Sequence, residues 1–91
     1  MKIKYTSHLK TRIQLRGYDE SLPRIIFKES AERYFDTQTQ HFIAVKELST
    51  HHHPLAISYD DFETYIEIVT IHPIPRKQIS NRVMTKRWKP L

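Results

Sequence analysis

Apolar residues recur at helical spacing up to about residue 29 and at strand spacing after it. The first stretch predicts a helix from about Ser7 that ends at the only glycine, Gly17, in the position of a C-cap. The segment YDESLPRIIFKES then predicts a second helix, capped by Asp19 or Ser21 and with Pro23 in its first turn. Because only one or two residues join them, the two helices are expected to form an αα-hairpin.

Four strands are predicted after the change of period. ERYFDT and HFIAVKEL have strand patterns joined by the polar turn DTQTQ, and PLAISY and FETYIEIVTI form two more, joined at Asp60-Asp61. Short connections favour an antiparallel meander. IPRKQISNRVM predicts a closing helix with Pro75 in its first turn and with Ile79 and Val83 facing inward. The expected fold is therefore α+β: a two-helix hairpin, a four-stranded antiparallel sheet and a short C-terminal helix, with the helices on one sheet face.

Composition limits the class of protein. With 91 residues, 38% of them hydrophobic, the chain is expected to form one domain over residues 1–91. It contains no Cys, which excludes a disulfide and a thiolate metal site and fits a reducing compartment. The sequence shows no signal-peptide core and no apolar run of bilayer length, so we expect a cytoplasmic protein without membrane contact.

Positive charge is concentrated at the two ends of the chain. Residues 1–18 hold five Lys and Arg and no acid, and residues 74–91 hold six and no acid. Residues 19–73 hold all ten acids against four Lys and Arg. Two cationic ends that meet in the fold would form a basic face suited to RNA, DNA or another polyanion. The alternative, for each end alone, is a solvated helix surface.

A stripe on the first predicted helix is the leading candidate site. His8, Arg12 and Arg16 recur every four residues and therefore share one side of the helix. An anion against this stripe would relieve the mutual repulsion of its members. Two Arg beside His8 would disfavour its protonated form and leave a neutral base. A surface or capping role for His8 is the alternative.

The C-terminal segment QISNRVMTKRWKPL supplies the second half of the basic face. Arg82 offers a planar fork that matches phosphate. Trp88 suits either stacking on a nucleic-acid base or burial, and burial is the commoner outcome for Trp. The residues expected to contact nucleic acid are Lys10, Arg76, Lys77, Asn81, Lys86, Arg87 and Trp88.

The remaining histidines carry weaker signals. His51–His53 are adjacent on a predicted loop, whereas zinc ligands are usually separated by other residues, so we expect no metal and no cofactor. His72 ends the best-predicted strand just before a basic helix. There it is either a second proton-transfer group or a structural cap.

Two segments resemble a known family. SHLKTRIQLRGYDES is similar to the His-x-x-x-Arg-x-x-x-Arg-Gly signature of an uncharacterised domain family within the RelE/ParE-like toxin superfamily, and ISNRVMTKRW resembles that family's C-terminal Asn-Arg…Arg-Trp stretch. The resemblance implies the α+β fold stated above and a type II toxin paired with an acidic antitoxin. RelE-like and HigB-like members cut mRNA on the ribosome. BrnT-like members cut RNA without an obvious need for a ribosome, and ParE-like members inhibit gyrase.

By position, the resemblance places His8, Arg12 and Arg16 opposite Arg82 and Arg87 in a catalytic site. We expect RNA cleavage without a metal, with His8 as acid or base and three of the arginines stabilising the phosphate. RelE-like catalytic residues on the central strands have no match here, so whether the protein is an enzyme stays open. The alternatives are a non-catalytic nucleic-acid-binding protein, a gyrase-type inhibitor and an inactive toxin. A homodimer through an edge strand at residues 32–36 is a further expectation.

Overall fold

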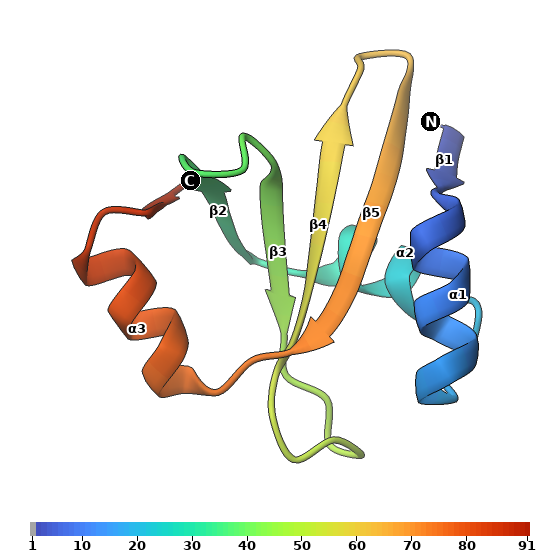
Figure 1. Ribbon diagram of the computed structural model, residues 1–91, viewed down its shortest axis with the longest axis horizontal. Helices are drawn as coiled ribbons and strands as arrows, with labels where there is room; N and C mark the ends of the chain where they lie inside the picture. Colours follow the sequence, from blue (N-terminus) through green and yellow to red (C-terminus); the bar gives the residue numbers. More distant parts are fainter. Residues whose placement is uncertain (1) are drawn as a thin grey trace.

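A computed structural model of the chain describes residues 2–91 and shows one six-stranded sheet with three helices packed against it (Figure 1). The strand order is β1-β5-β4-β3-β2-β6, in which β1 and β5 are parallel and every other neighbouring pair is antiparallel. The elements are β1 (Lys2–Tyr5), α1 (Ser7–Arg16), α2 (Leu22–Glu29), β2 (Glu32–Asp36), β3 (Phe42–Lys46), β4 (Leu55–Asp61), β5 (Tyr65–Pro73), α3 (Arg76–Met84) and β6 (Trp88–Pro90).

The predicted fold is wrong in its sheet and in its helix arrangement. The sheet is mixed and six-stranded, not four-stranded and antiparallel, because the two ends of the chain add β1 and β6 as its edges. Both strands are short, and each pairs with a strand far away in the sequence, so neither has a local hairpin signal. Residues 17–21 separate α1 from α2, and instead of forming a tight hairpin α1 packs on β5 while α2 packs on β3 and β4.

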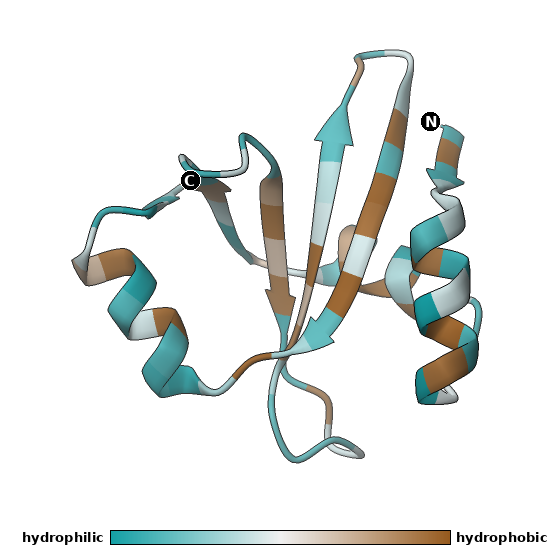
Figure 2. Ribbon diagram, viewed as in Figure 1, coloured by the Kyte–Doolittle hydropathy of each residue, from teal (hydrophilic) through white to brown (hydrophobic). Residues whose placement is uncertain are grey.

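The helices lie on both faces of the sheet, not on one. Successive residues of β3 point to opposite faces. Ala44 packs with Leu9 of α1 and Ile26 of α2, whereas Ile43 packs with Ile79 of α3. Two hydrophobic cores therefore share one sheet, and Figure 2 shows the matching alternation of apolar and polar positions along β5. We call the two sides the α1–α2 face and the α3 face.

Several local predictions are confirmed. Helix α1 begins at Ser7, and Gly17 follows its last turn with φ 67° and donates its N–H to the carbonyls of that turn. Pro23 lies in the first turn of α2 as predicted, whereas Pro75, predicted in the first turn of the last helix, is the N-cap that precedes α3. Glycine tolerates the positive φ after a helix, and proline tolerates the fixed φ at a helix start. The helix boundaries at these residues can therefore be recognised in the sequence.

Strand β2 is not an edge, so the expected dimer contact through residues 32–36 is wrong. It lies between β3 and β6, and its backbone groups are used on both sides. Within residues 2–91, no helix is both long and apolar enough to cross a membrane.

Candidate anion-binding site

The register of the central strands puts polar side chains on the α3 face. Ser58 of β4 is paired with Thr70 of β5, and their hydroxyl oxygens lie 2.8 Å apart. His72 is two residues further along β5, opposite Ala56, and therefore points to the same face. Polar residues thus occupy the middle of a sheet whose other face is apolar.

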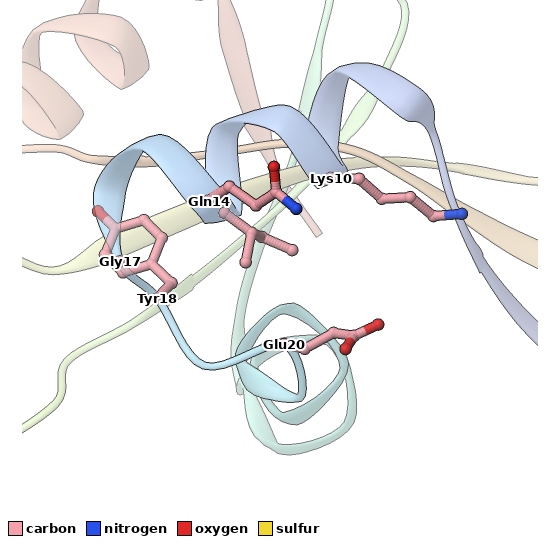
Figure 3. A pocket seen from close by; sticks show the side chains of 6 residues that line it. Lys10, Gln14, Gly17, Tyr18 and Glu20 are labelled. Carbon is pink, nitrogen blue, oxygen red and sulfur yellow. The ribbon is translucent and has the colours of Figure 1, made fainter.

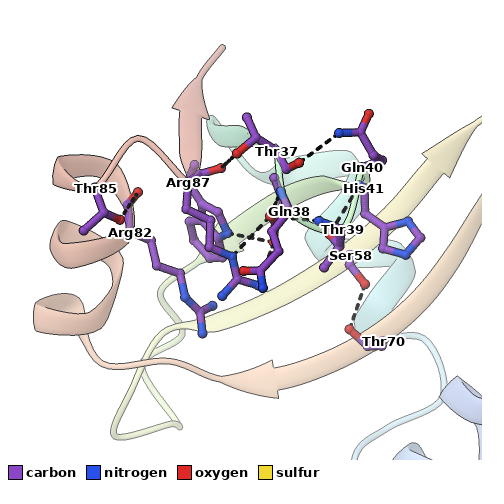
Figure 4. Close-up of polar contacts among 12 residues, drawn as sticks. Thr37, Gln38, Thr39, Gln40, His41, Ser58, Thr70, Arg82, Thr85 and Arg87 are labelled. Atoms are coloured by element: carbon purple, nitrogen blue, oxygen red, sulfur yellow. Dashed lines mark hydrogen bonds and ion pairs between the residues drawn. The ribbon is translucent and has the colours of Figure 1, made fainter.

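These side chains form the floor of a hollow of about 340 Å³ between the sheet and the C-terminal segment. Helix α3 and strand β6 supply one wall. Figure 4 shows Arg82 reaching from α3 toward the floor, with Ser58 and Thr70 beyond it and His41 on the far side. The lining residues are Asp36, Thr39, His41, Ile43, Ser58, Thr70, His72, Arg82, Arg87 and Trp88.

A buried carboxylate anchors the wall. Asp36 is 2% exposed and accepts hydrogen bonds from the guanidinium of Arg87 at 3.2 and 3.1 Å and from the indole N–H of Trp88 at 3.2 Å. The backbone N–H groups of Gln38 and Thr39 donate to it at 2.9 and 3.2 Å. Burial alone would raise the pKa of Asp36, but these donors lower it to about 2. The carboxylate is therefore ionised at neutral pH, and its role is structural.

Arg82 is a cation without an anion. Its guanidinium stacks over the ring of Trp88 at 5.1 Å, which fixes its position. In the described part of the chain, no carboxylate lies within ion-pair distance of it. Partial burial and the nearby charge of Arg87 lower the pKa of Arg82, although a guanidinium remains protonated. A held and unpaired cation that faces a hollow favours binding of an anion.

The pKa of His72 is lowered by burial and by charges from both basic ends of the chain. Burial is the larger cause, followed by the positive charges of Arg82, Arg12 and Arg16. Arg82 belongs to α3 and lines the same hollow, whereas Arg12 and Arg16 belong to α1, which packs along β5 and does not line it. The lowered pKa leaves the imidazole uncharged at neutral pH.

The structure separates the four predicted catalytic residues. Arg82 lines the hollow with His72, whereas His8, Arg12 and Arg16 on α1 do not line it. Arg12 and Arg16 affect His72 only through their positive charge, and His8 is exposed in the first turn of α1. The imidazole that lies in the hollow with Arg82 is His72 at the end of β5, which the sequence indicated only weakly.

The residues predicted to contact nucleic acid are also divided. Arg76 is paired with Glu32 at 2.7 Å and with Glu47 at 3.1 Å. Arg87 is paired with Asp36, and Trp88 is 1% exposed, so its ring has no room for a base. Of the residues predicted to contact nucleic acid, Lys77 and Asn81 on α3 and Lys86 just after it are exposed.

Lys10 lies on the other flank of α1, away from the arginines. It lines a separate hollow of about 410 Å³ with Gln14, Gly17, Tyr18 and Glu20 (Figure 3). This hollow combines one cation with one acid, so it has no excess positive charge for a polyanion.

One pair in the site has no signal in the sequence. His41 and Asp60 lie 19 positions apart, and the Nδ1 of His41 is 2.6 Å from a carboxylate oxygen of Asp60. They become neighbours because the antiparallel strands β3 and β4 place Ile43 opposite Ser58. Continuing the same register by two residues places residue 41 opposite residue 60. Only the register of two strands reveals this pair. In residues 2–91, no group of three or more His, Cys, Asp or Glu side chains is placed to hold a metal ion, and His51–His53 stay in a loop.

Comparisons with protein families, curated proteins and solved structures find no match to this chain. The resemblance to the toxin superfamily therefore remains a prediction. What the site does has to follow from its own chemistry: an uncharged imidazole, an unpaired guanidinium and two hydroxyl groups that line one hollow.

Proposed function

We propose that the hollow binds a phosphodiester of single-stranded RNA and that the protein cleaves it through the 2′-hydroxyl of the RNA. The observation that carries the proposal is that Arg82, which has no ion-pair partner among the described residues, lines one hollow with His72. The guanidinium attracts a phosphate, and the uncharged imidazole of His72 is a proton acceptor.

The net reaction moves one proton from the 2′-oxygen to the 5′-oxygen and exchanges one phosphorus–oxygen bond for another. His72 takes the proton of the 2′-hydroxyl, whose oxygen attacks the neighbouring phosphorus and forms a 2′,3′-cyclic phosphate. The bond from phosphorus to the 5′-oxygen breaks, and that oxygen leaves as a hydroxyl after a second group donates a proton to it. Arg82 stabilises the charge that builds up on the phosphoryl oxygens, and Arg12 and Arg16 add positive charge from α1. DNA lacks the 2′-hydroxyl and would bind without being cleaved.

The resemblance of the two basic segments to RelE/ParE-like toxins supports the same proposal. A toxin of this class, held by an acidic antitoxin, would arrest growth when expressed without its partner. Growth arrest that disappears with His72→Gln would tie toxicity to this hollow.

The direct test is cleavage of end-labelled RNA in EDTA, with and without ribosomes. We compare the unmodified protein with His72→Gln and Arg82→Gln. The matched control is Lys28→Gln, because Lys28 is an exposed cation on α2, against the other face of the sheet. We expect cuts that end in a 2′,3′-cyclic phosphate, a loss of about 10²–10⁴-fold for His72→Gln, and no change for Lys28→Gln.

Two outcomes would contradict the proposal. Binding with a steep salt dependence but no cleavage would indicate a non-catalytic nucleic-acid-binding protein. Neither binding nor cleavage would remove RNA as the target and leave a protein target such as gyrase. Cleavage on the ribosome alone would support the proposal and narrow its substrate.

A further inference from the structure

His41 lines the same hollow as His72, and its side chain is paired with Asp60. Nδ1 of His41 donates to Asp60, so Nε2 is the nitrogen available for other chemistry. Both side chains are partly buried, at 31% and 27% exposed. A carboxylate that orients an imidazole through Nδ1 is a recurring arrangement in proton transfer. Nothing in the reaction as written so far uses this pair.

The lining of the hollow leaves few groups that can donate a proton. Its titratable side chains other than arginine are Asp36, His41 and His72. Asp36 is ionised and its oxygens are occupied by Arg87, Trp88 and backbone N–H groups. His72 already accepts the first proton in the proposed reaction, and burial and positive charge disfavour its protonated form, so it holds no proton for the leaving group at the start of the reaction. His41 remains.

We propose that His41, oriented by Asp60, is the general acid that protonates the leaving 5′-oxygen of the RNA. This inference rests on the proposed function. His41 gives the proton on Nε2 to the 5′-oxygen as the bond from phosphorus breaks, while His72 keeps the proton from the 2′-hydroxyl. Solvent then returns each imidazole to its starting state, so the two steps leave no net charge behind.

The position of the pair fits this role. Along the strand direction, the Ser58–Thr70 pair lies between the two histidines. The register places His41 beside Asp60 on one side of this pair, and His72 opposite Ala56 on the other. A phosphodiester above the two hydroxyls would present its two sides to different imidazoles. Because one of these hydroxyls donates to the other, one O–H remains to donate to a phosphoryl oxygen and position the phosphate. Asp60 is a positioning residue, because it acts through His41.

The test uses two RNA substrates that differ in one atom. One has the natural 5′-oxygen at the cleavage site, and the other has a bridging 5′-sulfur, a leaving group that departs without a proton. The variants are His41→Gln, Asp60→Asn and His72→Gln, with His52→Gln as the matched control, because His52 is an exposed imidazole in the 49–53 loop. Circular dichroism and thermal melting confirm that each variant is folded.

We expect His41→Gln to lose about 10²–10⁴-fold on the oxygen substrate and to regain nearly full activity on the sulfur substrate. Asp60→Asn should show a smaller loss with the same recovery, which a general loss of stability would not produce. His72→Gln should lose activity on both substrates, and His52→Gln on neither.

Three results are informative in different ways. Full activity of His41→Gln on the oxygen substrate would overturn this inference and leave the proposed function intact. An equal loss of His41→Gln on both substrates would also overturn it. Absence of cleavage of either substrate by the unmodified protein would overturn the proposed function and this inference together.

Discussion

Two arginines, one on each face of the sheet, show how the same side chain serves two purposes. Arg33 lies over Phe27, with its guanidinium carbon 5.0 Å from the ring centre, and donates to the Phe27 and Ser30 carbonyls and to the Tyr59 hydroxyl. Arg82 also lies over an aromatic ring, but its guanidinium donates to no other described residue. Both cations are held by packing, and only one has its donors satisfied.

The difference shows where to look for function in a chain for which the comparisons find no match. Arg33 ties α2 to β2 and β4, and its donors are used in doing so. Arg82 is held in place by Trp88 and keeps its donors free. A protein gains little stability from holding an unsatisfied cation, so a ligand is the better explanation for it.

The largest effect is expected where the support of Arg82 is removed. Asp36→Ala leaves the Arg87 guanidinium and the Trp88 N–H without a partner in the wall, and we expect a loss of about 3–5 kcal/mol in unfolding free energy. Urea denaturation measures it. An Asp36→Ala protein as stable as the unmodified one would mean that the wall does not depend on this carboxylate.

The Asp36 carboxylate also makes the stability of the protein depend on pH in the acidic range. The pKa of Asp36 is about 2 in the folded protein against an ordinary 3.8. A carboxyl group whose pKa is lowered by folding stabilises the folded state at pH values above its ordinary pKa. This contribution is lost as the pH falls to the pKa in the folded protein. Stability of the unmodified protein should therefore drop between about pH 4 and pH 2, and that part of the drop should be absent in Asp36→Ala.

A direct contrast of the two arginines gives the next largest effect. Arg33→Gln should lower the unfolding free energy by about 2 kcal/mol, because three hydrogen bonds at a partly buried site are lost. Arg82→Gln should cost under about 1 kcal/mol and instead weaken RNA binding. Equal losses of stability would mean that Arg82 is structural and would remove the basis of the comparison.

A smaller effect is expected at Thr6, whose side chain connects the start of α1 to β5. The Thr6 hydroxyl accepts from the Leu9 N–H at 3.1 Å and donates to the Val69 carbonyl at 3.0 Å. Thr6→Ala should cost about 1 kcal/mol, as for other lost helix caps. Thermal denaturation measures the cost, and Thr64→Ala, at an exposed hairpin tip, is the control. A cost below that of the control would contradict this role of Thr6.

The smallest expected effect is a shift in titration. Arg82→Gln removes one of the charges that lower the pKa of His72, so this pKa should rise while burial keeps it below 6.5. A two-dimensional NMR titration of the imidazole signals measures it, and the exposed His52 provides an internal reference. An unchanged pKa for His72 would show that Arg82 lies too far away to act on it.

The sequence was informative where the structure is local. Gly17 and Pro75 mark helix boundaries because their backbone preferences act on adjacent residues. Strand β5 was visible because its β-branched residues alternate. The edges β1 and β6 were missed because a strand of three or four residues is recognisable only by the strand it pairs with.

The candidate site was predictable in its charges but not in its geometry. The absence of acids from both ends of the sequence predicted a basic face shared by the two ends; in the structure Arg82 lines the hollow, whereas Arg12 affects His72 only through its charge. Which imidazole lies in the hollow with Arg82 depends on the register of β4 with β5, and the His41–Asp60 pair depends on the register of β3 with β4. Register is a property of pairing between distant segments, so composition and spacing along one segment do not contain it.

The pairing of Trp88 with Asp36, 52 positions earlier, also sets an order of events during synthesis. A ribosome delivers the sheet floor and α1 well before it delivers β6, so the growing chain holds His72 and Arg12 while Arg82 still lacks the ring that positions it. The wall of the hollow is therefore completed only after β6 has been synthesised.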